Sequence, residues 1–397
     1  MKWFKTTQPD DRILLVAGKG CKGGYIDLNG NWVIEPQFEI VNYFCDNGLA
    51  PVAYERFGKW GFIDKAGNWA IKPQFDWASY FSNNGLAPAE TNHRTGYINK
   101  IGEFVIEPQF YDAYAFAKNG LALARIGGWG RGYIDQTGKF VIGPFNDAFG
   151  FEENGFARIE QNGKYGFVDK NGVVVKPQFD EVKAFIEKSE LTPVKLNNKW
   201  GYVDKTGNLV IKPQFERVGN FAEIGLAPVV INDIYGYIDK TGDFVIEPQF
   251  VYASVFAENG LAVVRFNGKF GCIDKTGNYV IKPQFEDVYD FAKNGWAVAK
   301  QNGYGSYGYI DKNGDWVIKP QFGYAHPFEE NGLAIASLNG KDGVIDQNGN
   351  FVIEPQYDFV EFFMDIIVVK QNQKWGIVDT NGNTLAEPQF NIISIPH

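Results

Sequence analysis

A block of apolar and polar residues recurs eleven times along the chain, and the sequence from Gly236 to Phe250, GYIDKTGDFVIEPQF, is a typical copy. The proline of each copy lies 33 to 37 residues after the previous one. Repetition at a fixed short period predicts a repeat architecture. Each copy opens with a glycine, which we name the opening glycine: Gly24, Gly61, Gly96, Gly132, Gly166, Gly201, Gly236, Gly271, Gly308, Gly343 and Gly376.

Each copy has a polar segment of the type Asp-Lys-Thr-Gly-Asn between two apolar runs, which predicts a hairpin turn. The Asp side chain can accept hydrogen bonds from the nearby backbone, and the glycine, here named the turn glycine, can adopt the positive φ of a tight turn. The recurring Asp could instead hold a metal ion. Asn99 replaces it in one copy, however, and a hard cation needs several carboxylates. The turn interpretation is therefore favoured.

The run after the turn reads aromatic-Val-Ile-charged-Pro-Gln-Phe, as in Trp32 to Phe38. Side chains alternate along a strand, so Val33 and Ile34 lie on opposite faces. Apolar residues on both faces predict a strand that is covered on both faces by stacked repeats. We expect Pro36, which has no N–H, to end the regular pairing.

The next segment, as in Asp287 to Gly295, places apolar residues at i and i+3 before Asn-Gly. This pattern predicts a short helical turn that ends at a glycine cap. The apolar run from Leu261 to Val264 and the polar Asn267-Gly268 pair predict a further strand and hairpin. Each unit should therefore contain three strands and a short helical turn.

These elements predict an all-β repeat protein of about eleven three-stranded β-meander units with short helical turns. Residues 1–11 should form a lead-in, residues 12–390 a single array, and residues 391–397 a C-terminal cap. The chain starts with a first strand and ends after a third, so no unit is divided between the termini as it usually is in propellers. The sequence thus favours an open curved solenoid, with a closed propeller-like ring as the alternative.

The net charge of −9 argues against nucleic acid as the main partner. The sequence contains no apolar run that could span a bilayer, so membrane insertion is not expected. Residues 1–12 carry no signal-peptide core, which favours a cytoplasmic protein, with a removed leader as the open alternative. Cys21, Cys45 and Cys272 show no CxxC spacing and indicate neither a disulfide framework nor a zinc site.

No catalytic constellation is found in the sequence. The three histidines, His93, His326 and His397, form no nucleophilic set with Ser, Cys or Asp that the spacing supports. No glycine-rich phosphate loop follows a strand. We therefore expect no enzyme, no catalytic residue, no cofactor and no metal.

Aromatic residues recur two positions after most turn glycines. Such a ladder of rings could stack against sugars, as in repeat lectins, but a core in which each unit presents its ring to the next is favoured. Rings outside this pattern are better candidates for a partner-binding surface: Phe57, Trp77, Trp129, Trp296 and Tyr304. The ladder itself comprises Trp32, Trp69, Phe104, Phe140, Leu209, Phe244, Tyr279, Trp316 and Phe351.

The units resemble the WG repeat, also called the KWG repeat, through the Lys-Trp-Gly that begins at Lys59, Lys199 and Lys374. The resemblance covers nearly the whole chain. It implies a mainly bacterial β-repeat family without a shared enzymatic activity, similar to an interaction module. The expected function is a non-enzymatic protein-binding scaffold that inhibits or neutralises a protein partner such as a toxin. The alternative is a carbohydrate-binding repeat protein that uses the aromatic ladder, with a glycan as its partner.

Overall fold

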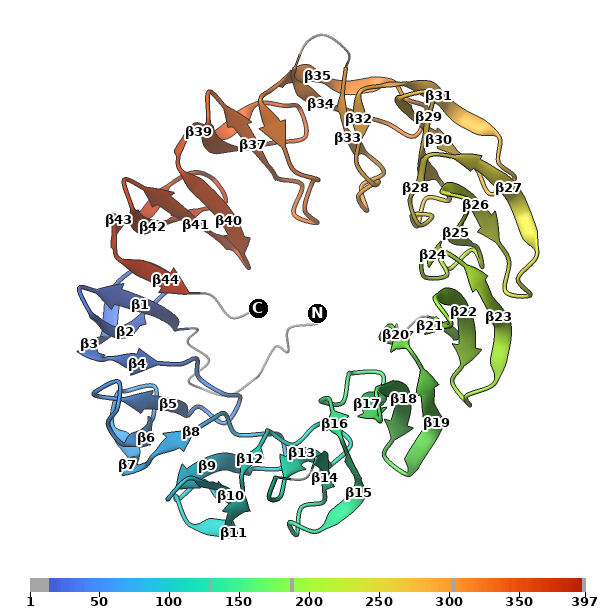
Figure 1. Ribbon diagram of the computed structural model, residues 1–397. Coiled ribbons are helices and arrows are strands. Elements are labelled where there is room, and N and C mark those ends of the chain that lie inside the picture. Colours follow the sequence, from blue (N-terminus) through green and yellow to red (C-terminus); the bar gives the residue numbers. More distant parts are fainter. Residues whose placement is uncertain (1–13, 129, 186–188, 302–304, 395–397) are drawn as a thin grey trace. The chain divides into compact units, whose positions relative to one another are not determined.

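The computed structural model describes residues 14–128, 130–185, 189–301 and 305–394, and these residues form eleven four-stranded antiparallel sheets (Figure 1). The all-β repeat prediction is confirmed. The predicted helical turns are wrong, because no helix is found in the described residues. Accordingly, the described part of the chain has no helix that could cross a membrane.

The segment predicted as a helical turn is a two-residue strand followed by a β-turn. Asp287 and Val288 pair with Lys300 and Ala299 of the next strand. The Asn-Gly pair then closes the turn, since the Gly295 N–H donates to the Ala292 carbonyl at 2.9 Å. The repeat therefore contains four strands, and the short strand begins the sheet of the next repeat.

Every sheet has the same meander order, from the short strand through a first and a second inner strand to a long strand at the other edge. The short strands are β4 (Ile40–Val41), β8 (Trp77–Ala78), β12 (Asp112–Ala113), β16 (Asp147–Ala148), β20 (Glu181–Val182), β24 (Arg217–Val218), β28 (Tyr252–Ala253), β32 (Asp287–Val288), β36 (Tyr324–Ala325), β40 (Phe359–Phe363) and β44 (Ile392–Ser394). The first inner strands are β1 (Leu15–Lys19), β5 (Ala50–Ala53), β9 (Ala87–Thr91), β13 (Ala122–Arg125), β17 (Ala157–Gln161), β21 (Leu191–Leu196), β25 (Ala227–Ile231), β29 (Ala262–Phe266), β33 (Ala297–Lys300), β37 (Ala334–Leu338) and β41 (Ile366–Gln371).

The remaining two strand classes carry the apolar runs on either side of the Asp turn. The second inner strands are β2 (Lys22–Ile26), β6 (Trp60–Ile63), β10 (Arg94–Ile98), β14 (Arg131–Ile134), β18 (Lys164–Asp169), β22 (Lys199–Asp204), β26 (Ile234–Ile238), β30 (Lys269–Ile273), β34 (Tyr307–Ile310), β38 (Lys341–Ile345) and β42 (Lys374–Asp379). The long strands are β3 (Trp32–Phe38), β7 (Trp69–Phe75), β11 (Phe104–Phe110), β15 (Phe140–Phe145), β19 (Gly172–Phe179), β23 (Leu209–Phe215), β27 (Phe244–Phe250), β31 (Tyr279–Phe285), β35 (Trp316–Phe322), β39 (Phe351–Tyr357) and β43 (Thr384–Phe390).

The Asp turn has the predicted structure. In the sixth copy Asp204 Oδ1 accepts hydrogen bonds from the backbone N–H groups of Thr206 and Asn208, both at 2.9 Å. Asn99 makes the equivalent bonds through its amide oxygen at 3.0 and 3.1 Å. A neutral oxygen is therefore sufficient, which supports the turn interpretation over the metal alternative.

Replacing the turn glycine Gly207 or Gly242 with valine should destabilise the fold by about 1–3 kcal/mol. Their φ angles are +88° and +95°, which a β-branched residue does not readily adopt. A Cβ at Gly207 would also lie 2.8 Å from the Val174 carbonyl oxygen. Urea unfolding followed by circular dichroism gives the free energy, with Thr206→Val as a control in the same turn. Unchanged stability at both glycines would contradict the assignment.

The long strand continues through its proline, so the prediction that pairing ends there is wrong. Trp200 pairs with Phe215 and Tyr202 with Ile211, so two residue steps on β22 match four steps on β23. The extra residues form a bulge that accommodates Pro213. The bulge passes over the opening glycine, since a Cβ at Gly201 would lie 2.3 Å from the Ile211 carbonyl oxygen.

The hydrophobic core lies between neighbouring sheets. Tyr237 and Ile246 of one sheet pack with Ala262 and Ile273 of the next. Of the two aliphatic residues in the long strand, the Ile is buried, but the Val is half-exposed: Val245 is 46% exposed. The prediction that both faces are covered is therefore wrong, because the long strand is the edge of its sheet.

The chain divides into two compact units. The first unit comprises residues 1–127, 136–138 and 356–397, and the second comprises residues 128–135 and 139–355. Each unit has cores between consecutive sheets, as in the cluster around Phe62 and Phe75 in the first unit and the cluster around Tyr202 and Phe215 in the second.

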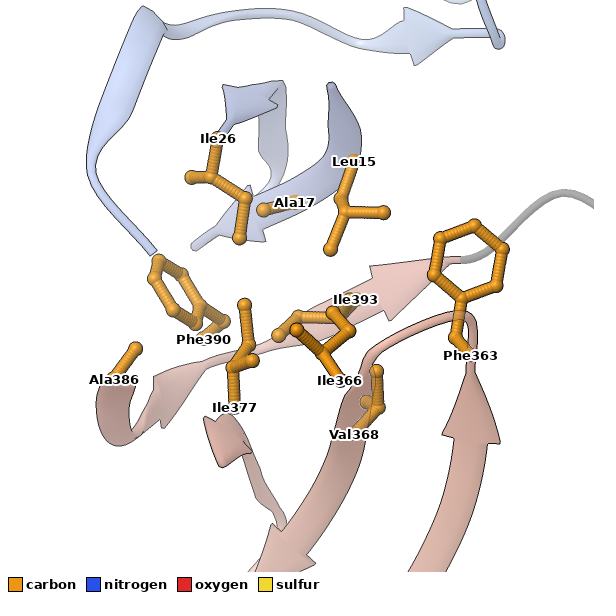
Figure 2. Packing of buried hydrophobic residues seen from close by; sticks show 10 residues of the cluster. All are labelled: Leu15, Ala17, Ile26, Phe363, Ile366, Val368, Ile377, Ala386, Phe390 and Ile393. Atoms are coloured by element: carbon orange, nitrogen blue, oxygen red, sulfur yellow. The ribbon is translucent and has the colours of Figure 1, made fainter. Parts of the chain in front are cut away.

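Within the first unit, the last strand of the chain completes the first sheet. Strand β44 pairs with β1, with Ala17 opposite Ile393, in the sheet order β3-β2-β1-β44 (Figure 1). Leu15, Ile26 and Ile393 pack in one cluster with side chains of strands β40 to β43 (Figure 2). The prediction of an open solenoid is therefore wrong. One sheet combines strands from the two ends of the described chain, as the propeller-like alternative requires. Residues 392–394 of the segment that the sequence predicts as a C-terminal cap form strand β44.

The lysine two positions before the opening glycine links a carboxylate to the next hairpin. Lys164 forms an ion pair with Asp180, just after the long strand β19. Asp180 also accepts a hydrogen bond from the Asn197 N–H at 2.7 Å. Lys59 and Asp76 repeat this arrangement in the first unit. In each pair the hydrogen bond from lysine holds the pKa of the carboxyl below its usual range.

The double variant Asp76→Asn, Asp180→Asn should lose less stability than the native chain when the pH falls from 7 to 3. A carboxyl whose folded-state pKa is depressed stabilises the fold above its unfolded pKa, and this contribution disappears as the pH falls through the folded pKa. Melting temperatures at both pH values measure the difference. Asp365→Asn, an exposed residue in the turn between β40 and β41, is the control. An equal loss in the native chain and the double variant would contradict the assigned role.

Candidate binding site

The structure describes three of the five aromatic residues that the sequence singled out. Phe57 lies in the loop between β5 and β6, and its side chain is 97% exposed. Trp77 is the first residue of the short strand β8 and is 37% exposed. Trp296 is partly buried and packs edge-on against Phe328, with ring centroids 5.3 Å apart. Trp129 and Tyr304 lie outside the described residues.

Phe57 and Trp77 belong to the first unit, and Trp296 belongs to the second. Trp296 contributes to the packing of a core cluster. Of the three, Phe57 and Trp77 present the more exposed rings.

Seven rings of the aromatic ladder pack between neighbouring sheets, as favoured from the sequence, although Tyr279 remains 37% exposed, and Leu209, which has no ring, is 42% exposed. In each of seven junctions the ladder ring stands edge-on against the last phenylalanine of the preceding long strand. The pairs are Trp32–Phe390, Trp69–Phe38, Phe104–Phe75, Phe244–Phe215, Tyr279–Phe250, Trp316–Phe285 and Phe351–Phe322. Rings that make these contacts hold adjacent sheets together.

A second aromatic set lies at the first residue of the short strands. Trp77, Tyr252, Tyr324 and Phe359 hold this position in four sheets, and all four are between 37% and 41% exposed. Two of them contact a second ring two strands away in the same sheet, as Tyr252 contacts Phe270 at 5.8 Å, whereas Tyr324 contacts Tyr307 of the preceding sheet. Sequence reasoning identified Trp77 alone, because the segment was interpreted as helical.

Tyr324 of this set belongs to a cluster of three tyrosines in the second unit. The rings of Tyr289, Tyr307 and Tyr324 have centroids 5.6 to 6.4 Å apart. Burial and the hydrogen bonds that the Tyr289 hydroxyl donates to Tyr324 and Tyr307 raise the pKa of Tyr289, so this hydroxyl stays protonated. His326 stands edge-on to Tyr324 at 5.1 Å.

A pocket of about 360 Å³ opens beside Tyr252, also in the second unit. This volume lies in the usual range for sites that bind small molecules. Its walls combine two cationic side chains, two aromatic rings and several small apolar groups. The lining residues are Lys183, Trp200, Arg217, Val218, Gly219, Pro228, Tyr235, Ala253 and Val255, and we name this site the cationic pocket.

The two rings in the cationic pocket position its cations. Lys183 Nζ lies 5.3 Å from the centre of the Trp200 ring and donates to the Val218 carbonyl at 2.8 Å. The Arg217 guanidinium lies 5.4 Å from the centre of the Tyr235 ring. Cation–π contacts of this kind hold long, flexible side chains in place. Burial lowers the pKa of Lys183 because it disfavours the charged form.

The sequence carried one signal for this pocket that was not used. The residue four positions after the last phenylalanine of the long strand is large in most repeats, but Gly219 stands there after β23. Pro228 packs directly against this glycine, and both residues form part of the pocket wall. No group of three or more His, Cys, Asp or Glu residues suitable for a metal ion is found in the described residues.

The model of the WG-containing repeat matches eleven segments of the chain: residues 24–55, 60–92, 96–128, 132–165, 165–200, 200–233, 235–270, 270–304, 307–341, 343–375 and 375–394. The chain belongs to the WG-containing repeat family. The recognition made from the three Lys-Trp-Gly motifs is therefore confirmed. No curated protein matches the sequence.

Several solved structures resemble this WG-repeat chain weakly. A eukaryotic initiation factor has 11% identity and a TM-score of 0.42, over 86% of this chain and 95% of its own. Hsv2p of Kluyveromyces lactis has 10% identity and a TM-score of 0.37, over 60% and 95%. The extracellular domain of a putative one-component system from B. thetaiotaomicron has 10% identity and a TM-score of 0.30, over 98% and 67%. At these scores the likenesses carry no argument about function.

The tryptophans of the WG repeats have a structural role in this chain. Trp60 and Trp200 are buried, at 8% and 7% exposure. Lysines lie over the rings of Trp200 and Trp375, at 5.2 to 5.6 Å from the ring centres. A WG tryptophan therefore supports the cation beside it.

Proposed function

We propose that this WG-repeat protein is a non-enzymatic binding scaffold whose ligand is a carbohydrate. The supporting observation is the set of half-exposed rings at one repeated position, represented in the second unit by Tyr252 and Tyr324. Sugar rings present C–H groups that pack on aromatic faces, and tyrosine adds a hydroxyl for hydrogen bonding. The ladder rings are engaged between sheets, so the binding rings are those of the short strands.

Binding to an immobilised glycan panel tests this function, followed by titration calorimetry with the best glycan. Tyr252→Ala or Tyr324→Ala should weaken binding wherever the sugar contacts the replaced ring. In at least one of the two variants the affinity for the glycan should fall by about tenfold, which corresponds to 1.4 kcal/mol. Phe57→Ala is the control, because this exposed ring belongs to the first unit. Absence of binding to every glycan, or binding unchanged in both tyrosine variants, would overturn the proposal.

A protein partner is the second candidate, and the exposure of Phe57 favours it. A phenylalanine that is 97% exposed at a loop tip exposes apolar surface that a partner could bury. The Arg56 guanidinium lies 6.0 Å from the Phe57 ring. Arginine is one of the residue types enriched at the hot spots of protein interfaces. Capture of one protein, a toxin included, that requires Phe57 and ignores Tyr252 and Tyr324 would favour this candidate.

A further inference from the structure

Gly219 and Pro228 lie together in the wall of the cationic pocket. Gly219 holds the position four residues after the long strand, and a Cβ there would lie 2.6 Å from Pro228 Cγ. Pro228 therefore occupies the space that a Cβ at residue 219 would need. Other repeats of the second unit fill this position with Phe149, Lys183, Ser254, Tyr289 and His326.

One wall of the pocket carries the ammonium group of Lys183, which interacts electrostatically with Glu181 without a direct ion pair. Lys183 Nζ donates to the Val218 carbonyl, which uses one of its three N–H groups. No ion pair joins Lys183 to any residue that the structure describes. Glu181, on the same face of its strand, forms an ion pair with Lys195 at 3.5 Å. An anion in the pocket would offset the desolvation of the ammonium group.

The other wall carries a guanidinium that is weakly paired. Arg217 lies 3.8 Å from Asp233, whose side chain is 93% exposed. Exposed pairs of this kind contribute little and exchange easily for another carboxylate. The planar guanidinium can bind a carboxylate through two parallel hydrogen bonds. No acidic residue lines the pocket.

The pocket is continuous with one of the exposed rings. Ala253 and Val255 line it, and they follow Tyr252 on the same segment. The Tyr252 ring also lies 6.2 Å from the ring of Tyr235, which forms the pocket wall. A ligand with its anionic group between Lys183 and Arg217 can therefore place its body against Tyr252.

We propose that the cationic pocket binds the carboxylate of an acidic sugar, with the sugar ring against Tyr252. This inference rests on the proposed carbohydrate-binding function and specifies the ligand as a uronic acid glycan. Lys183 and Arg217 pair with the carboxylate, and the small apolar wall of Ala253 and Val255 accommodates the ring edge. The site places two cations in a pocket whose lining contains no acidic residue, in a chain of net charge −9.

Titration calorimetry with trigalacturonate and with its fully methyl-esterified form tests the charge directly, because the two ligands differ in the carboxylates alone. The acid should bind at least tenfold more tightly than the ester, and the preference should decrease as the salt concentration rises. Equal binding of both ligands would overturn the acidic-sugar inference and leave the carbohydrate function standing. If neither trigalacturonate nor its ester binds but a different, neutral glycan does, the acidic-sugar inference is also overturned and the carbohydrate function still stands. Failure of every glycan would overturn both.

Variants that keep the bulk of the side chain locate the site. Lys183→Met and Arg217→Met should each weaken binding of the acid by about tenfold or more and leave binding of the ester unchanged. Lys370→Met is the matched control, because Lys370 lies over Trp375 at 5.2 Å in the first unit, outside the pocket. Thermal melts check that each variant is folded. Loss of the acid preference in Lys370→Met, or its retention in both pocket variants, would place the carboxylate elsewhere.

Discussion

A chain that ends at Phe390 should be less stable than the full-length protein by about 5 kcal/mol or more. The truncation removes β44, whose Ile393 is 6% exposed and packs on Leu15 and Ile26. Loss of a buried Ile costs about 2–5 kcal/mol, and each lost backbone hydrogen bond about 1 kcal/mol more. The removed strand includes the bond from the Asn391 N–H to the Gly18 carbonyl at 2.9 Å. Urea unfolding of both chains measures the difference.

Two neighbouring residues give this experiment its control. Ile393→Ala should cost about 2–5 kcal/mol, whereas Ile392→Ala should cost less than about 1 kcal/mol, because Ile392 is 51% exposed. Equal effects of the two substitutions, or a truncated chain as stable as the full-length protein, would show that β44 does not complete the first sheet. An open array would give that result, since its terminal units do not share a sheet.

The sequence predicted the elements that local chemistry determines. The Asp turns, the two-residue Asn-Gly hairpins and the three main strands follow from residues within a few positions of one another. In the turn at Asn267 and Gly268, both residues have positive φ, as this type of hairpin requires. The same local reasoning showed that Asn99 can replace the turn aspartate.

The short strand could not be recognised from local pattern. Two residues are too few to show alternation, and Val288 and Phe291, three positions apart and both at least partly buried, fit one turn of helix equally well. Its pairing partner belongs to the next repeat. For β44 the partner is β1, at the opposite end of the sequence, so the sequence could not distinguish a divided sheet from a cap.

The binding site was predictable in part. Trp77 was found because it interrupts a repeated pattern, and it shares its position with Tyr252, Tyr324 and Phe359. The cationic pocket was missed because its lining residues come from several strands, and no local pattern brings them together. A comparison of equivalent positions across the repeats, instead of a search for reactive residues, is what identifies such a site.

Replacing an opening glycine with alanine should be more damaging than the change of one methyl group suggests. In Gly201→Ala the new Cβ would lie 2.3 Å from the Ile211 carbonyl oxygen and 2.7 Å from the Pro213 nitrogen. Both atoms belong to the backbone of the bulge, so no rotamer change relieves the contact, and we expect a loss of about 3 kcal/mol or more. Urea unfolding gives the value.

Gly150→Ala is the matched control, because a Cβ there meets no atom within 4 Å. This variant should change stability by less than about 0.5 kcal/mol. The repeats also supply a graded series within the second unit. The same contact measures 2.2 Å at Gly166 and 2.7 Å at Gly236, so Gly166→Ala should destabilise more than Gly236→Ala. If all three opening-glycine variants match Gly150→Ala, the bulge does not require the glycine. A reversed order would mean that the bulge shifts readily to accommodate a methyl group.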